Sequence, residues 1–368
     1  MTGYRIPTDL LPLDGRFGCG PSKVRPEQVD YLMRHADLLG TSHRQKPIRA
    51  LVARVREGLA DLYRLPAGYE VILGNGGSTA FWDAAAFSLI ENRSAHLAFG
   101  EFGAKFVKAA SAPWLQKPFV RVGEPGTVSA FDGTEEADVF AWPHNETSTG
   151  AMAGVTRQGP AGALSVVDAT SAAGGVDIDI TETDVYYFAP QKNFASDGGL
   201  WFAIMSPAAI ERVNRIAESD RYIPEFLSLN IAIENSRLDQ TLNTPAVATL
   251  LLMDAQIQWM RESGGLAWAG ARTKESSDLI YAWAEAHPNA SPFVANPDHR
   301  SQVVATIDFD ETVDAAAVAA LLRANGVVDI DPYRKLGRNQ LRVATFTAIE
   351  PTDVRRLLAS IDDAIAHI

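Results

Sequence analysis

A carboxylate and an amine each stand just after an apolar run in the middle of the chain. Asp168 follows the run 164–167, and Lys192 comes shortly after the run 185–188. Runs of this length and composition are typical of strands that are buried on both faces of a sheet. The carboxyl ends of the strands in an open α/β sheet line its ligand crevice, so we expect both side chains to face one cavity.

Lys192 has the surroundings that an amine needs in order to form an imine. Such an amine must be neutral part of the time, and the aromatic residues at 186–188 and Phe194 supply an apolar setting that favours the neutral form. A carboxylate such as Asp168 could hold a pyridine nitrogen protonated, which makes the ring an electron sink. Each residue also has an ordinary interpretation, because Asp168 could cap a helix and Lys192 could be an exposed lysine at a strand end.

Two further polar stretches lie where they could contact the same ligand. The glycine-rich stretch 74–79 joins an apolar run to a helical pattern, and its backbone N–H groups with the hydroxyls of Ser78 and Thr79 could bind an anion. It lacks the third glycine of a dinucleotide fingerprint and the Gly-Lys-Ser/Thr of a P-loop. The stretch 142–150 begins at the end of the run 138–142, and its polar residues could meet a bound ring. A plain turn is the alternative for both stretches.

The elements that must position these residues alternate between helical and strand patterns. An amphipathic helix is predicted over 48–65 and a second helix over 80–90. Most of the strand-like runs are continuously apolar, which favours an α/β domain with a mainly parallel sheet. The predicted strands are 69–73, 95–99, 119–122, 138–142, 164–167, 185–188 and 200–205.

The pattern changes after about residue 245, where a smaller α+β domain is predicted. We expect an N-terminal segment over 1–23 that contributes to the site and to the small domain, a large domain over 24–250 and a small domain over 251–368. A helix near 246–262 could bridge the two parts. The other predicted elements are helices 268–287, 313–325 and 353–368, the last with Thr352 as a possible cap, and strands 302–309 and 341–346.

Composition excludes several classes of protein. The formal net charge of −12 argues against broad binding to nucleic acid or to anionic lipid. The single cysteine, Cys19, excludes a disulfide framework and a cysteine-based zinc site, and it suits a reducing compartment such as the cytoplasm. Neither a signal peptide nor a membrane span is expected.

Several short motifs together resemble those of the phosphoserine aminotransferases. They are Gly-Cys-Gly-Pro at 18–21, Ser-His-Arg at 42–44, Asn-Glu-Thr at 145–147, Gln-Lys-Asn at 191–193 and Asn-Thr-Pro at 243–245. This family belongs to the class V, fold-type I aminotransferases, which depend on pyridoxal phosphate. The resemblance extends over essentially the whole chain. It implies transfer of an amino group from L-glutamate to 3-phosphohydroxypyruvate, in serine and pyridoxine biosynthesis, by a homodimer with shared active sites.

The resemblance also implies roles for individual residues. Lys192 would be the Schiff-base lysine, which moves a proton from Cα to the C4′ carbon of the cofactor in a ping-pong cycle, and Asp168 would be the partner of the ring nitrogen. Thr147 would bind the ring hydroxyl and Phe102 would stack on the ring. The cofactor phosphate would be held by Gly77, Ser78, Thr79 and Gln191, and by Asn243 and Thr244 from the other subunit.

Substrate would be bound by cations. Arg342 is the candidate for the α-carboxylate. The candidates for the phosphate are His43 and Arg44, with Arg334 or Lys335 across the dimer.

The chain departs from the family pattern at several of these positions. Phe102 replaces a frequent tryptophan, and Ser78 replaces a common arginine. Cys19 aligns with a serine that can meet substrate, and a His-Arg pair aligns near Arg334 and Lys335. These departures indicate a divergent branch.

Other functions stay open at this point. An alanine–glyoxylate type transaminase would keep the cofactor but use substrates without a phosphate. A non-catalytic dimer that binds pyridoxal phosphate would keep the fold alone. A cysteine desulfurase is disfavoured because the chain has no late cysteine, and a nicotinamide dehydrogenase because the third glycine is missing.

Overall fold

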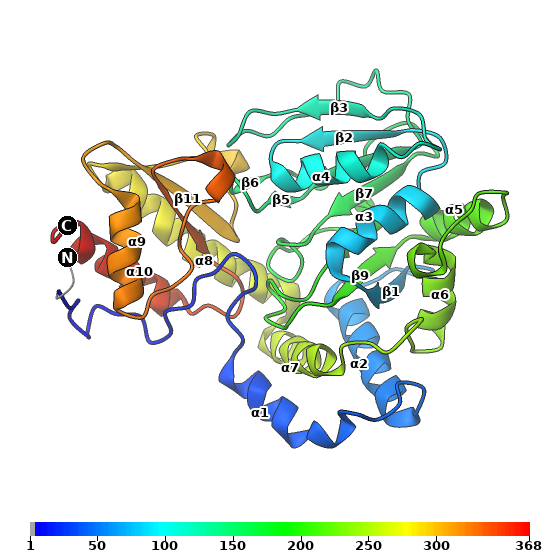
Figure 1. Cartoon of the computed structure of the whole chain (residues 1–368), viewed down its shortest axis with the longest axis horizontal. Coiled ribbons are helices and arrows are strands. Elements are labelled where there is room, and N and C mark those ends of the chain that lie inside the picture. The colour runs from blue at the N-terminus through cyan, green and yellow to red at the C-terminus, as the bar shows by residue number, and fades with distance from the viewer. Residues whose placement is uncertain (1–3) are drawn as a thin grey trace.

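A seven-stranded sheet forms the centre of the larger part of the protein. The computed structural model describes residues 4–368, and Figure 1 shows the arrangement of the elements. Strand β9 runs antiparallel to its neighbours β1 and β8, and all other neighbouring pairs are parallel, so the predicted mainly parallel sheet is confirmed. In spatial order the strands are β1 (Glu70–Asn75), β9 (Leu200–Met205), β8 (Val185–Phe188), β7 (Leu164–Asp168), β4 (Val139–Pro143), β2 (Ser94–Ala98) and β3 (Phe119–Val122).

Helices cover both faces of this sheet, which explains why its central strands are continuously apolar. Every residue of β2, β4, β7, β8 and β9 is buried, whereas the edge strand β3 alternates between half-buried and exposed residues. One face packs against α3 (Gly77–Ser88), α4 (Glu101–Ala110), α5 (Pro207–Ala217) and α6 (Leu229–Arg237). The other face packs against α2 (Lys46–Leu62) and α7 (Val247–Ser263).

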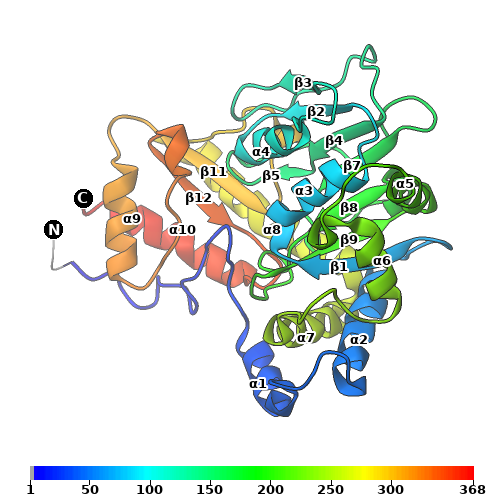
Figure 2. The same cartoon turned by 45° about the vertical axis from the view of Figure 1, so that its right-hand side comes forward.

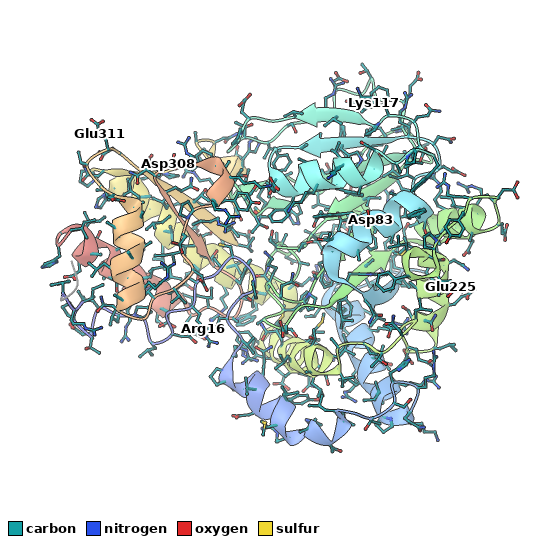
Figure 3. The ribbon with its side chains drawn as sticks, viewed as in Figure 1. Arg16, Asp83, Lys117, Glu225, Asp308 and Glu311 are labelled. Carbon is teal, nitrogen blue, oxygen red and sulfur yellow. The ribbon has the colours of Figure 1, made fainter. Side chains whose placement is uncertain are left out.

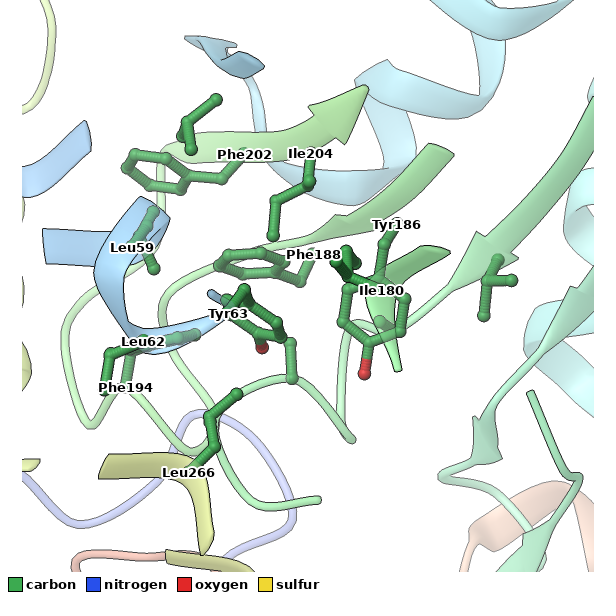
Figure 4. Packing of buried hydrophobic residues seen from close by; sticks show 14 of the residues in the cluster. Leu59, Leu62, Tyr63, Ile180, Tyr186, Phe188, Phe194, Phe202, Ile204 and Leu266 are labelled. Carbon is green, nitrogen blue, oxygen red and sulfur yellow. The ribbon is translucent and has the colours of Figure 1, made fainter. Parts of the chain in front are cut away.

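The core on the α2 face reaches the loop that carries Lys192. Figure 4 shows Phe188 of β8 among Tyr63, Phe194 and Phe202. The rings of Phe188 and Phe194 are stacked with their centroids 5.0 Å apart. Because Phe194 lies two positions after Lys192, this packing anchors the loop to the sheet.

A second, three-stranded antiparallel sheet lies beside the first and has its own core. Its strands are β10 (Ala290–Pro292), β11 (Val304–Phe309) and β12 (Gln340–Ala344). Helices α8 (Gly265–Ala286), α9 (Ala315–Ala324) and α10 (Pro351–Ile365) pack on it, as Figure 2 shows. Charged residues such as Lys117, Glu225 and Glu311 lie at the outside of the molecule (Figure 3).

The first described residues run along the small sheet before they enter the large part. Phe17 is buried in the small core, and its carbonyl accepts a hydrogen bond from the N–H of Ala344 in β12. Arg16 forms an isolated bridge with Val328. The remaining elements are α1 (Pro26–Arg34), β5 (Asn145–Glu146), β6 (Ala151–Met152) and the 3-10 turns η1 (Ala36–Leu38), η2 (Ile180–Glu182), η3 (Glu225–Leu227), η4 (Pro297–His299) and η5 (Arg334–Leu336).

The predicted elements all have counterparts, and the differences lie at their ends. Helix α3 begins at Gly77 rather than at residue 80, so the helix takes in part of the glycine-rich stretch. The cap predicted at Thr352 is wrong, because α10 begins at Pro351 with Glu350 in the cap position. The domain limits 1–23, 24–250 and 251–368 stay predictions. Among residues 4–368, no helix combines the length and the apolar character that crossing a membrane requires.

Candidate active site

A cavity of about 440 Å³ lies at the carboxyl ends of the parallel strands. It brings together eight of the residues singled out from the sequence: Gly77, Ser78, Thr79, Phe102, Thr147, Asp168, Gln191 and Lys192. The rest of its lining comes from Gly20, Pro21, Gly76, Trp82, Asn145, Thr170, Asp197, Gly198 and Gly199. The cavity therefore joins the N-terminal segment to the ends of β1, β2, β4, β7 and β8.

Lys192 is buried at the base of this cavity. Its Nζ donates a hydrogen bond to the carbonyl of Cys19. Burial lowers the pKa of its amine to about 8, and Arg342 contributes in the same direction, while Asp168 opposes the shift. About a tenth of the amine is therefore neutral at pH 7, far more than for an exposed lysine, and this form is the one that nucleophilic and base chemistry require.

The N-terminal segment passes so close to Lys192 that it leaves no room for a side chain. A Cβ atom at Gly20 would lie 2.1 Å from Nζ and 2.4 Å from Cε of Lys192. Gly20 also has a φ of +126°, which L side chains rarely adopt. Glycine is therefore required here for both reasons.

Asp168 ends β7 and is held by neighbours on both of its oxygens. Oδ1 accepts from the backbone N–H of Thr170 (3.0 Å) and lies 2.6 Å from its hydroxyl. Oδ2 accepts from the indole N–H of Trp82 (3.1 Å), which also lies 2.9 Å from the hydroxyl of Tyr187. The carboxylate thus holds a turn and also lines the cavity, whereas the helix cap of its ordinary interpretation is wrong, because no helix begins after β7 at this point.

Trp82 and Thr170 are site residues that the sequence reasoning missed. Thr170 carries the only local signal, since a hydroxyl two positions after an aspartate commonly bonds to it. Its hydroxyl also lies 2.7 Å from Oγ of Ser78, which connects Asp168 to the first turn of α3. Trp82 comes from the helix after the glycine-rich stretch, and its contact with Asp168 is a product of the tertiary fold.

The first turn of α3 faces the cavity with the features of an anion site. The first N–H groups of a helix lack partners within the helix and carry partial positive charge, and Gly77, Ser78 and Thr79 supply them here. Gln191 lies in the same wall, and its buried Oε1 has no hydrogen-bond partner among residues 4–368. The buried Oδ1 of Asn145 also has no hydrogen-bond partner among residues 4–368.

Arg342 and Cys19 lie behind Lys192. The Nη1 of Arg342 donates to the carbonyl of Thr147 (2.8 Å), while its Nε has no partner among the described residues. The Cys19 thiol contacts the carbonyl of Arg342 (3.8 Å), and burial raises the pKa of this thiol. Burial therefore favours the protonated thiol, although the neighbouring Arg342 and Lys192 oppose this effect on its pKa. The guanidinium keeps donors for an anion.

The other predicted site residues do not line the cavity of their own chain. His43 and Thr244 lie together, with Nδ1 and Oγ1 3.3 Å apart, and Arg44 donates to Gln240 (2.6 Å). Asn243 lies in the same surface loop. Arg334 is exposed, and Lys335 forms an ion pair with Glu101 at the start of α4. The roles suggested for these residues stay predictions.

Fold and site together define a class of protein. A mainly parallel sheet whose strand ends hold a buried lysine, a carboxylate and a helix N-terminus is the arrangement of the fold-type I enzymes that use pyridoxal phosphate. A phosphoserine aminotransferase from Cytophaga hutchinsonii has this fold, with a TM-score of 0.87 at 22% identity over 95% of this chain and 99% of that one.

Residues 21–329 match the family model named "Aminotransferase class-V", and the chain belongs to that family. It is 62% identical to a putative phosphoserine aminotransferase of Mycolicibacterium vanbaalenii, over 99% of this chain and 98% of the relative. It is 58% identical to a phosphoserine aminotransferase of a Nocardioides species, over 99% of both chains.

Proposed function

We propose that the protein transfers the amino group of L-glutamate to 3-phosphohydroxypyruvate, giving 2-oxoglutarate and L-phosphoserine. The observation that carries this proposal is the buried amine of Lys192, which shares one cavity with Asp168. Full-length identity of 58–62% to proteins named as phosphoserine aminotransferases supports the choice of substrates. The reaction would supply serine biosynthesis.

The cavity fits pyridoxal phosphate. It offers a buried amine, a carboxylate, an aromatic wall and an anion site, and it contains two buried polar oxygens, on Asn145 and Gln191, that a ligand would satisfy. When bound, the cofactor supplies a carbonyl carbon that exchanges amines and a ring that accepts an electron pair. Asp168 would hold the ring nitrogen, Phe102 and Thr147 the ring, and the first turn of α3 with Gln191 the phosphate.

Lys192 is the proton carrier of the proposed reaction. Its pKa of about 8 lets the neutral amine take the proton from the substrate Cα and release it again within one turnover. The carbonyl of Cys19 orients Nζ in the protein without cofactor, and the lysine side chain is buried. Thr170 and Trp82 hold the Asp168 carboxylate in place, and its proposed partner is the ring nitrogen, so the role of base is assigned to Lys192 alone.

Substrate selection is assigned to the cations around the cavity. Arg342 is fixed by the carbonyl of Thr147 and would bind the α-carboxylate with its free donors. His43 and Arg44, with Arg334 or Lys335, would bind the phosphate of one substrate and the side-chain carboxylate of the other. These cations would build a local positive field in a protein whose net charge is −12.

The proposal includes a cytoplasmic homodimer. Asn243, Thr244, His43 and Arg44 gather on the surface outside the cavity of their own chain. Residues with these roles could reach a cofactor or substrate only in a partner subunit, so each site would be completed by the other chain. The large and small domains keep the limits 24–250 and 251–368 in this proposal.

Lys192→Ala tests the proposed function. The variant should retain non-covalent pyridoxal phosphate, because the ring and phosphate contacts remain, but it should lose transamination of phosphoserine with 2-oxoglutarate by about 10³-fold or more. Turnover near that of the wild type in Lys192→Ala would remove the assignment. A wild-type protein that transaminates alanine with glyoxylate faster than it transaminates phosphoserine would instead support the alternative substrate class.

A further inference from the structure

Two residues that would hold the cofactor ring come from different parts of the chain. Phe102 lies in the first turn of α4, and Thr147 lies in the turn between β5 and β6. Both residues line the cavity. A ring that stacks on Phe102 and bonds Thr147 through its hydroxyl needs both residues at fixed positions, so a contact between their two elements would position the ring.

The side chain of Glu146 makes that contact. Its Oε2 accepts hydrogen bonds from the backbone N–H groups of Phe102 and Gly103, both at 3.0 Å. Its Oε1 accepts from the N–H (3.1 Å) and the hydroxyl (2.6 Å) of Ser148. One carboxylate therefore bonds the start of α4 with one oxygen and the turn that contains Thr147 with the other.

Helix α4 depends on this turn for its cap. Gly100 occupies the cap position and has no side chain, so the first N–H groups must find acceptors elsewhere. Ser148 Oγ accepts from the N–H of Glu101 (3.1 Å), and Glu146 accepts the next two. A Cβ atom at Gly100 would lie 2.2 Å from Cγ of Glu146, so the two residues fit together only because position 100 is glycine.

Glu146 is fully buried, and burying a carboxylate costs free energy of folding unless hydrogen bonds offset it. Burial raises the pKa of its carboxyl, and the donors on Ser148 and Gly103 oppose that rise. Four hydrogen-bond donors and the positive end of α4 stabilise the negative charge of the Glu146 carboxylate. The carboxylate does not line the cavity, so its task is not direct contact with a ligand.

We propose that Glu146 is a positioning residue that fixes the distance and the angle between Phe102 and Thr147. The proposal rests on the proposed function, because it assigns these two residues to the cofactor ring. The same turn also holds Arg342 through the carbonyl of Thr147, so Glu146 indirectly orients the candidate carboxylate ligand. Asn145 and Thr147, its neighbours in the Asn-Glu-Thr motif, line the cavity, whereas Glu146 fixes their turn through its hydrogen bonds with Ser148.

Glu146→Gln is the test, because glutamine keeps the size but turns an NH₂ group toward one pair of donors. We expect the dissociation constant for pyridoxal phosphate to rise about tenfold and kcat to fall about tenfold to hundredfold, with little change in KM for phosphoserine. We also expect faster amide hydrogen exchange at 101–103 in the protein without cofactor. This second readout does not depend on activity.

Glu135→Gln is the matched control. Glu135 is also buried, and it also accepts from backbone N–H groups, those of Asp132 and Gly133, but it lies away from the cavity. The Glu135→Gln variant should be less stable than the wild type, with unchanged cofactor affinity and kcat. Should Glu146→Gln not fold, Ser148→Ala removes the acceptor for the N–H of Glu101 and one of the four donors to Glu146, and it should change the same quantities in the same direction to a smaller extent.

Three outcomes separate the possibilities. Unchanged cofactor affinity, kcat and exchange at 101–103 in a folded Glu146→Gln variant would overturn the positioning role. Equal effects of Glu146→Gln and Glu135→Gln on cofactor affinity and kcat would show that Glu146 only stabilises the fold. That result would also overturn the positioning role. Failure of the wild-type protein to transaminate phosphoserine would count against the proposed function, while the exchange measurement would still test the link between the start of α4 and the turn that contains Thr147.

Discussion

The amine of Lys192 depends on its neighbours for its reactivity. A lysine in water holds its proton throughout the physiological range, whereas burial lowers the pKa of this one to about 8. The sequence placed Lys192 and Asp168 after neighbouring strands, and the structure brings both to one cavity. Trp82, which bonds Asp168 from another helix, could not be predicted, because no spacing in the sequence indicates that contact.

This shifted pKa predicts how cofactor attachment depends on pH. The protonated amine has no lone pair, so attack on the cofactor carbonyl requires the neutral form. The rate at which the protein without cofactor captures pyridoxal phosphate should therefore rise about tenfold per pH unit below 8 and level off above it. Stopped-flow absorbance of the Lys192–cofactor adduct measures this rate.

The pH experiment has one control variant and one outcome that would contradict the prediction. Lys192→Ala serves as the control, since it should give no covalent signal at any pH. A rate in the wild type that continues to rise steeply up to pH 10 would show that the amine keeps the pKa of an exposed lysine, contrary to the burial that we describe.

At the scale of elements, the sequence was most informative where burial is complete. The buried strands β7, β8 and β9 appear as continuous apolar runs, and each was predicted to within one residue. The antiparallel direction of β9 could not be predicted, because a strand buried on both faces has the same composition in either direction. Helix α1 was not predicted, because its one buried residue is the polar Gln28 and the helix therefore has no buried apolar stripe.

The segment that passes over Lys192 offers a sharp test at this scale. In Gly20→Ala the new methyl group would coincide with the ε-amine, 2.1 Å away, so we expect at least about a hundredfold loss of transamination. Gly40→Ala is the matched control. Gly40 also has a positive φ, +80°, but has open space around it, so it should lose only about 1–2 kcal/mol of stability.

Initial rates and thermal unfolding of both variants separate the two effects. An active Gly20→Ala variant would mean that residues 18–21 lie farther from Lys192 than we describe. Equal loss of activity in Gly40→Ala would point to a general cost of backbone strain rather than to a collision with the amine.

At the scale of the whole molecule, most of the predicted residues fall into two separate groups. One group lines the cavity, and the other, with His43, Arg44, Asn243 and Thr244, lies on the surface. Sequence spacing could not separate the two groups, because it does not specify which chain a residue serves. A shared site in a homodimer is the simplest arrangement in which both groups act on one ligand.

Mixed dimers test this arrangement. Lys192→Ala and Asn243→Ala should each have low activity alone. When the two variants are co-expressed, half of the dimers should contain one site in which both residues are intact, so activity should return to about a quarter of the wild-type value. Purification through two different affinity tags isolates the mixed dimer for the assay.

A mixture no more active than the better single variant would show that each chain builds its site alone. Co-expression of Lys192→Ala with Asp168→Ala is the control. Both of those residues line the same cavity of one chain, so every site of the mixed dimer lacks one of them, and activity should not return under either arrangement.

The path of the N-terminal segment has a consequence for how the protein is made. The wall over Lys192 contains Cys19, whose thiol contacts the carbonyl of Arg342, 323 positions later in the chain. A ribosome therefore synthesises the first part of this wall early and its support on β12 near the end. A nascent chain that already carries Lys192 lacks that support, so the amine acquires its final surroundings only after β12 has left the exit tunnel.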